Sequence, residues 1–222
     1  EKQASDVQRQ LTETRLRLLQ AQIEPHFLFN TLASAQQLAQ KGAPDAARLI
    51  GHLVRFLRIS IPSMRDDKGA LKREFEQIAA YLAIMQTRMG ERLQYSVEAQ
   101  AGSEQFPLPP ALVMTLVENA IKHGIEPAAE GGRVDVRSLI DGQQLVISVA
   151  DTGVGLTPDS GDAGETGTGL GLSNIAQRLQ AIYGDAARLQ LTQNAPRGCL
   201  ATLFLPLTAG DTPAPPSSTL PV

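Results

Sequence analysis

The stretch Glu24-Pro25-His26-Phe27-Leu28-Phe29-Asn30 places one of the chain's three histidines inside a segment with a helical pattern of apolar residues. The apolar positions around it recur every seven residues, at Leu11, Leu18, Pro25, Leu32 and Ala39. Such a repeat is typical of a helix that packs against other helices. Proline removes a backbone donor and crowds the preceding turn, so Pro25 predicts a kink next to His26. Taken alone, His26 is most simply interpreted as a core histidine.

Length, composition and charge exclude several classes of protein. The chain has 222 residues, 42% hydrophobic and 19% charged, which is typical of globular domains with one or two cores. A net charge of −3 without a basic tract argues against nucleic acid or an anionic membrane as the main partner. Cys199 is the only cysteine, which excludes an intrachain disulfide and a cysteine-based metal cluster.

The first ninety residues have a helical pattern throughout. Residues 1–41 predict one long helix, residues 42–45 a turn, and residues 46–60 and 71–89 two further helices. Helices with such wide apolar stripes usually complete their core with a second copy, which predicts a dimeric four-helix bundle. The sequence has no apolar stretch long enough to cross a bilayer. Because it opens within a helix-forming run and without an initiator Met, we expect a fragment whose missing N-terminal part would hold a sensor or membrane segments.

The pattern changes after Gly90. Strands are predicted at 94–100, 133–140, 144–149, 188–192 and 199–205, and helices at 111–123 and 170–183. Helices interrupted by hairpins predict an α+β fold, with an antiparallel or mixed sheet covered by helices on one face. From Thr208 the sequence is rich in Pro, Ser, Thr and Ala, which predicts a disordered tail.

Three segments of the second half carry residues suited to binding a nucleotide. In Leu116–Gly124, the side chains of Asn119, Lys122 and His123 are three or four residues apart and would share a helix face. An amide oxygen one turn before a cation suits Mg²⁺ and phosphate together, because Mg²⁺ keeps several waters and takes few protein oxygens. Alone, this segment is better explained as a solvated helix face.

The other two segments are rich in glycine. In Asp151-Thr152-Gly153-Val154-Gly155, an aspartate at a strand end can accept a hydrogen bond from an adenine amino group, and the glycines let backbone approach a flat ring. In Gly167–Asn174, glycines directly before a helix offer free N–H groups to phosphate. Residues 157–166 predict a lid. A Rossmann fold is excluded because no strand–GxGxxG–helix unit opens a parallel sheet.

In this order and spacing, the three segments resemble the N, G1 and G2 boxes of the GHKL ATP-binding fold shared by histidine kinases, gyrase, Hsp90 and MutL. With Pro-His-Phe-Leu-Phe-Asn upstream, the chain resembles the LytS-type sensor histidine kinases over residues 12–207. The resemblance implies a helical dimerisation and phosphotransfer region at 1–92, a GHKL (Bergerat) α/β sandwich that binds ATP at 93–208, and a tail at 209–222.

The resemblance also implies roles for individual residues. His26 would be the phosphoacceptor, Asn119 would hold Mg²⁺, Lys122 and His123 would face the phosphates of ATP, and Asp151 would read adenine. The remaining predicted positions would shape the pocket and the lid: Gly153, Gly155, Gly167, Thr168, Gly169, Leu170 and Gly171. The implied partners are a second copy of the chain and a response regulator receiver domain of the LytTR type. The implied location is the cytoplasmic side of an inner or plasma membrane, as part of a sensor protein.

Departures from the family pattern leave the general base open. Many other histidine kinases have an acid immediately after the phosphoacceptor, where this chain has Phe27. Glu118, next to Asn119, is a candidate base from the ATP side, whereas the amide of Asn30 cannot take a proton at neutral pH. At the entrance to the last strand, Gly198-Cys199 replaces the frequent Gly-Thr, so the adenine contacts there stay open.

Two alternatives to an autophosphorylating kinase follow from these departures. Hydrolytic GHKL ATPases generally have a water-activating glutamate one turn before the metal-binding asparagine, where this chain has Thr115. Glu118 points about 100° away from Asn119 around a regular helix, which argues against efficient hydrolysis. A degenerate dimeric scaffold that binds ATP without chemistry is the second alternative, because the neighbouring acid is missing.

Overall fold

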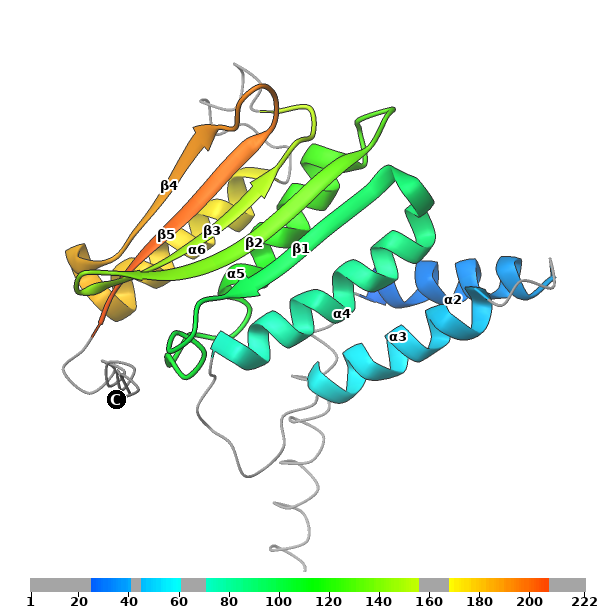
Figure 1. Ribbon diagram of the computed structural model, residues 1–222, viewed down its shortest axis with the longest axis horizontal. Helices are drawn as coiled ribbons and strands as arrows, with labels where there is room; N and C mark the ends of the chain where they lie inside the picture. Colours follow the sequence, from blue (N-terminus) through cyan, green and yellow to red (C-terminus); the bar gives the residue numbers. More distant parts are fainter. Residues whose placement is uncertain (1–24, 41–44, 61–70, 156–167, 208–222) are drawn as a thin grey trace, which may run out of the picture. The chain divides into compact units, whose positions relative to one another are not determined.

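A computed structural model of the chain describes residues 25–40, 45–60, 71–155 and 168–207 (Figure 1). These residues form two compact units. The first unit contains α2 (Pro25–Gln40), α3 (Asp45–Ser60) and Ala80–Gly90, and the second contains residues 71–79 and those from Glu91 onward. Helix α4 (Leu71–Met89) therefore contributes its first half to the second unit and its last half to the first.

The first unit is helical, as the sequence predicts. Its core contains three aromatic rings, with the centroid of Phe27 5.5 Å from that of Phe56 and 5.3 Å from that of Tyr81. Tilted and edge-to-face ring pairs at this spacing add to the stability that burial already provides. Helix α2 begins at Pro25 in the described residues, so the predicted kink before His26 and the predicted turn at 42–44 lie outside them.

The second unit is built on a mixed five-stranded sheet. Its strands are β1 (Leu93–Ala99), β2 (Gly132–Asp141), β3 (Gln144–Asp151), β4 (Arg188–Gln193) and β5 (Cys199–Pro206), in the order β1-β2-β3-β5-β4. Only the β1–β2 pair is parallel among these strands. Helices α5 (Leu112–Asn119) and α6 (Thr168–Tyr183) lie behind the sheet in Figure 1, so the prediction of an α+β fold is confirmed.

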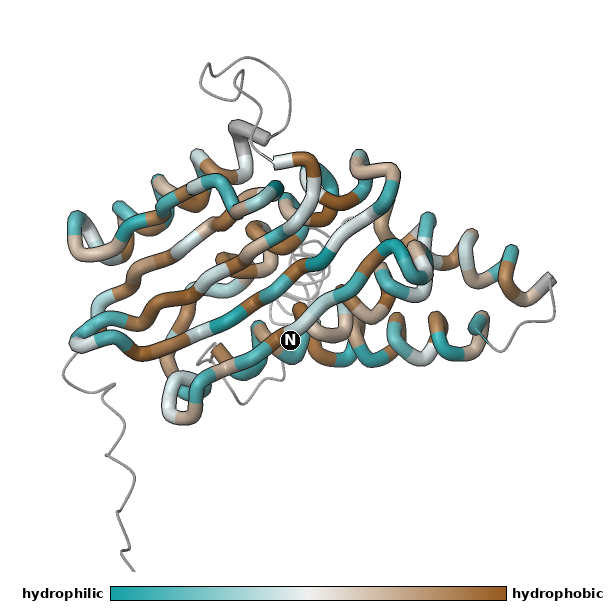
Figure 2. Tube along the Cα trace, turned by 45° about the horizontal axis from the view of Figure 1, so that its top comes forward, coloured by the Kyte–Doolittle hydropathy of each residue, from teal (hydrophilic) through white to brown (hydrophobic). Residues whose placement is uncertain are grey.

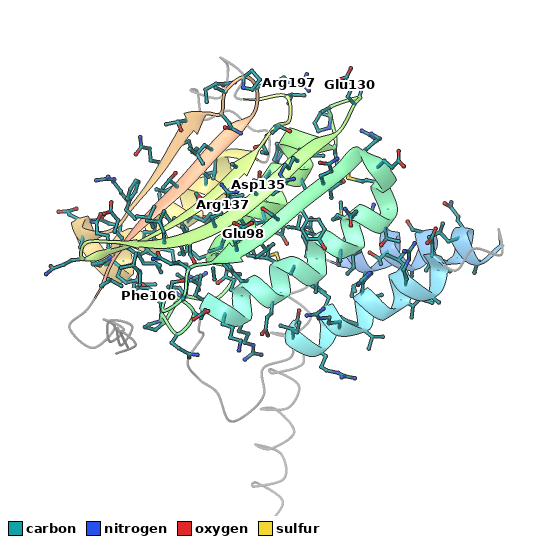
Figure 3. All side chains as sticks on the ribbon, in the orientation of Figure 1. Glu98, Phe106, Glu130, Asp135, Arg137 and Arg197 are labelled. Atoms are coloured by element: carbon teal, nitrogen blue, oxygen red, sulfur yellow. The ribbon has the colours of Figure 1, made fainter. Side chains whose placement is uncertain are left out.

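Residues alternate between the two faces of the sheet, as a period of two requires (Figure 2). Along β3, Leu145, Ile147, Val149 and Asp151 are buried, and the residues between them are partly exposed. The opposite face carries charges from neighbouring strands, including the labelled Glu98, Asp135 and Arg137 (Figure 3). Glu98 is opposite Arg137 in register, with Nε and Oε2 3.3 Å apart. Because both side chains are more than half exposed, this ion pair adds little stability.

The helix predicted at 111–123 differs from a regular α-helix at its C-terminal end. Helix α5 ends at Asn119 and continues as a π-helix, η2 (Ala120–Ile125), in which the N–H of Glu126 donates to the carbonyl of Ile121. The wider turn changes how Lys122 and His123 are oriented relative to Asn119, so the spacing of a regular helix does not hold there. Single π turns are frequent at functional sites, and this one follows directly on Asn119.

A buried carboxylate on α4 makes the stability of the fold depend on pH. Burial raises the pKa of Glu74 from 4.5 to about 7, although the N–H groups of Met114 and Val113 and the charge of Arg178 act in the opposite direction. The unfolded carboxyl ionises near 4.5, so the folded state holds more protons between pH 4.5 and 7, and the free energy of unfolding falls as pH rises.

We expect the wild-type chain to lose about 3 kcal/mol of stability across this window, and Glu74→Gln to lose clearly less, because the amide does not ionise. Denaturant unfolding of both proteins at pH 5 and pH 8 measures the difference. Parallel pH profiles for the two proteins would show that Glu74 is not the group that titrates.

Candidate active site

Asn119 occupies the last position of α5 and lies next to the first turns of α6. A Cβ atom added to Gly171 would lie 3.5 Å from Nδ2 of Asn119 and 3.6 Å from Cγ2 of Thr115. The Nδ2 atom of Asn119 is buried and has no hydrogen-bond partner among the described residues. A buried amide without a partner is costly in a folded protein. This orphaned donor, beside a helix that starts in a glycine-rich segment, therefore fits an anionic ligand such as a phosphate group.

Asp151 ends β3 with a carboxylate held by backbone donors. Its Oδ1 accepts the N–H of Gly153 at 2.8 Å, and the N–H of Cys199 also donates to the carboxyl. Burial raises the pKa of Asp151, and these two hydrogen bonds oppose the rise. The side-chain amide of Asn194 donates to the Asp151 carbonyl at 2.7 Å, which fixes the strand end. The Asp151 carboxylate can accept more hydrogen bonds than the two it receives from Gly153 and Cys199. It therefore suits a ligand that presents N–H groups.

Glycines let the loop after β3 touch η2 directly. A Cβ atom on Gly153 would lie 2.1 Å from the carbonyl oxygen of Gly124, and one on Gly124 would lie 2.7 Å from Oδ1 of Asp151. The N–H of Val154 donates to the same Gly124 carbonyl at 3.0 Å. A side chain at Gly153 would collide with the backbone of Gly124, and a side chain at Gly124 would displace the Asp151 carboxylate, so glycine fits best at both positions. Asp151 and the segment that follows Asn119 are thereby joined into one site.

The other predicted residues of this region differ in exposure. Lys122 and Glu118 are exposed, and His123 is half-buried. Burial and the neighbouring Lys122 charge lower the pKa of His123, while Glu126 acts in the opposite direction. His123 is therefore neutral at physiological pH and can accept or donate one hydrogen bond. Gly155 has a left-handed backbone, with a φ of 84°, where a Cβ atom would meet Gln193.

Several predicted site residues cannot be compared with the structure in full. Gly167 lies outside the described residues. Thr168, Gly169 and Leu170 form the first turn of α6, but their side chains are outside the described part. The same is true of His26, which is the second residue of α2. Their roles stay predictions.

Four residues that the sequence analysis did not assign to the site lie beside Asp151 or support it: Gly124, Asn194, Gly198 and Cys199. Gly198 adopts a φ of 120°, and a Cβ atom there would lie 1.9 Å from the Asp151 carbonyl oxygen. Burial, with a smaller effect of the Asp151 charge, raises the pKa of Cys199 to about 11, so its thiol stays protonated. Gly124 ends the quoted helical segment, and the sequence analysis names Gly198 and Cys199 at the entrance to the last strand without assigning them a role. Asn194 belongs to a different hairpin and has no signal of its own.

Comparisons with known proteins agree with this geometry. Residues 14–93 match a family model described as histidine kinase, and residues 110–209 match one described as histidine kinase-, DNA gyrase B- and HSP90-like ATPase. The chain belongs to the histidine kinase family. Its second unit is accordingly an ATP-binding domain of the GHKL type, and the resemblance seen in the sequence is confirmed.

The chain is similar to named sensor proteins. It is 33% identical over 187 residues to Sensor protein LytS of Staphylococcus haemolyticus, covering 81% of this chain and 32% of that protein. It is 34% identical over 193 residues to Sensor histidine kinase YpdA of Escherichia coli, covering 84% and 34%. The chain thus spans about a third of the length of these relatives.

A solved structure agrees on the fold of the chain. The histidine kinase domain of the Erythrobacter litoralis EL346 blue-light activated histidine kinase superposes with a TM-score of 0.50 at 22% identity, covering 95% of this chain and 97% of that one. In the described ranges, no helix is both long enough and apolar enough to span a bilayer.

Proposed function

We propose that this chain is the kinase core of a two-component sensor, in which ATP bound by the second unit phosphorylates His26. The observation that carries the proposal is the buried Nδ2 atom of Asn119, which has no hydrogen-bond partner among the described residues and lies beside Gly171. Asn119 ends α5, and the π-helix η2 that follows it contacts Asp151 through Gly124. One end of this site suits phosphate and the other suits the amino group of adenine. These two ends support the binding of a single ATP molecule, with its phosphates near Asn119 and its adenine near Asp151.

Mg²⁺ is part of the proposal. The described residues contain no group of three or more His, Cys, Asp or Glu that could hold a metal ion by themselves. The Oδ1 atom of Asn119 is the protein oxygen that we assign to Mg²⁺, which commonly takes one or two protein ligands together with substrate phosphates and water. When bound, Mg²⁺ neutralises phosphate charge. Lys122, exposed beside this site, adds a second positive charge.

The proposed reaction is an in-line phosphoryl transfer. The unprotonated ring nitrogen of His26 attacks the γ-phosphorus of ATP, an N–P bond forms, and the bond between the γ-phosphorus and the bridging oxygen breaks to release ADP. The proton on the other ring nitrogen is then lost to solvent or to a base, for which exposed Glu118 is the candidate. The attack requires a neutral imidazole, because a protonated ring has no free lone pair on nitrogen.

The whole protein's partners belong to the same proposal. Leu32, Ile50 and Val54 are about half exposed on α2 and α3, and apolar residues in this position support a helical interface with a second copy. We further propose transfer of the phosphoryl group to an aspartate of a response regulator of the LytTR type. Attachment to the inner or plasma membrane, with this part on the cytoplasmic side, would require segments beyond this chain.

One residue argues against hydrolysis as the main activity. Thr115, one turn before Asn119, donates its hydroxyl to the carbonyl of Ala111 at 2.7 Å and has no acidic group to activate water.

We expect incubation with γ-labelled ATP and Mg²⁺ to give label on the protein that is stable in alkali and lost in acid. Steady phosphate release without protein label would identify an ATPase instead, and nucleotide binding with neither product would identify a scaffold.

A further inference from the structure

The helix that carries Asn119 begins without a side-chain cap of its own. Ala111 precedes α5 in a left-handed conformation, with a φ of 63°, and makes no side-chain hydrogen bond. Alanine is a poor residue at this position because it cannot satisfy the free N–H groups of the first turn. A left-handed alanine is also strained, which makes the start of α5 dependent on support from elsewhere.

Glu74 supplies the missing cap from another helix. Its Oε1 atom accepts the N–H of Val113 at 2.7 Å and the N–H of Met114 at 3.0 Å. Glu74 lies on α4, about 40 residues earlier in the chain, and its side chain is buried. A carboxylate at the N-terminal end of a helix also interacts favourably with the helix dipole. The free N–H groups in the first turn of α5 are therefore capped by a residue of α4 and not by a residue next to them in the sequence.

A second contact, from α6, holds the same end of α5. Arg178 of α6 donates from Nη1 to the carbonyl of Pro110 at 2.8 Å, and its positive charge acts on the Glu74 carboxyl. Helix α6 also places Gly171 beside Asn119 at the other end of α5. Helix α5 has eight residues and is therefore only about 12 Å long, so a shift at its start reaches Asn119 within two turns.

We propose that Glu74 is a positioning residue for nucleotide binding: by capping α5 from α4, it sets where Asn119 lies against the first turns of α6. This role rests on the proposed function, since it concerns the same nucleotide site. Glu74 does not touch the nucleotide in this proposal and takes no part in proton transfer. It acts through the backbone of α5, so an uncharged side chain of the same shape should replace it.

The test measures ATP binding by the full chain with Mg²⁺, by calorimetry, together with the KM and kcat for ATP in the labelling reaction. We expect Glu74→Ala to raise the Kd and KM about tenfold, because two buried N–H groups lose their acceptor and Asn119 is no longer held in place. Glu74→Gln keeps the acceptor oxygen and should restore the Kd to within about twofold of wild type. Glu76→Ala, an exposed acid on the same helix, is the matched control and should bind as wild type does.

The outcomes separate positioning from general stability. If Glu74→Ala melts at a lower temperature but binds ATP with wild-type affinity well below that temperature, Glu74 is structural only and the proposal is overturned. If Glu74→Ala does not fold, Glu74→Asp replaces it: weaker ATP binding by the folded Asp variant, which keeps the charge but has a shorter reach, supports the proposal, and unchanged binding overturns it. A wild-type chain that does not bind ATP would instead contradict the proposed function itself.

Discussion

Replacing His26 by Gln should abolish protein labelling from γ-labelled ATP, a loss of at least about a thousandfold, because glutamine has no ring nitrogen that can form the N–P bond. The affinity for ATP should stay unchanged, since His26 lies on α2 in the helical unit and the proposed nucleotide contacts come from the other unit. The measurement pairs labelling with calorimetric titration of ATP on the same preparation.

The matched control for this variant is His52→Gln on α3. His52 is partly exposed and lies on a helix of the same unit, so its loss should leave labelling at the wild-type level. If labelling survives in the His26 variant but disappears in the His52 variant, the phosphoacceptor is on α3 and our assignment to α2 is wrong.

Replacing Asp151 by Asn should weaken ATP binding by about 10- to 100-fold without weakening the fold. The amide oxygen can still accept a backbone N–H from Gly153 or Cys199, both of which donate to the Asp151 carboxyl, but an NH₂ group replaces the second oxygen and cannot accept a hydrogen bond from the adenine amino group. Burial raises the pKa of Asp151, so ionisation of this group lowers the stability of the folded state as pH rises, and a neutral side chain removes that cost. Titration with ATP at pH 8, together with thermal melting, measures both effects.

Asp141→Asn is the control for this second prediction, because Asp141 is an exposed aspartate at the hairpin between β2 and β3. It should change neither ATP affinity nor stability. An Asp151 variant that binds ATP as tightly as this control would remove Asp151 from the adenine site. A variant that binds weakly and also melts earlier would indicate a packing role for the carboxylate.

Local pattern was sufficient to predict the elements of this fold. The alternation of residues in 144–149 and the apolar stripe in 71–89 are short-range signals, and β3 and α4 follow them closely. The sheet order was not predictable in the same way, since β5 lies between β3 and β4 and pairs with β3, which is distant in sequence. Periodicity says which residues face inward but not which strand is the neighbour.

The candidate site was predictable where its residues form a recognisable string and not where they act through tertiary contact. Asn119 and Asp151 belong to such strings; the structure describes a buried, unpaired amide nitrogen at Asn119 and a carboxyl at Asp151 whose pKa burial raises, and their roles stay predictions. Asn194, which supports Asp151, and Glu74, which caps α5, are ordinary polar residues in sequence. The π-helix after Asn119 was missed because a regular helical period fits residues 111–123 equally well.

The most direct measurement is to locate the phosphoryl group on the wild-type chain. The three histidines fall on three different tryptic peptides, 18–41 with His26, 49–55 with His52 and 123–133 with His123. After incubation with γ-labelled ATP and Mg²⁺ and digestion at alkaline pH, we predict that the label lies on peptide 18–41 alone. Label on either of the other two peptides, or a chain that binds ATP and remains unlabelled, would contradict the account.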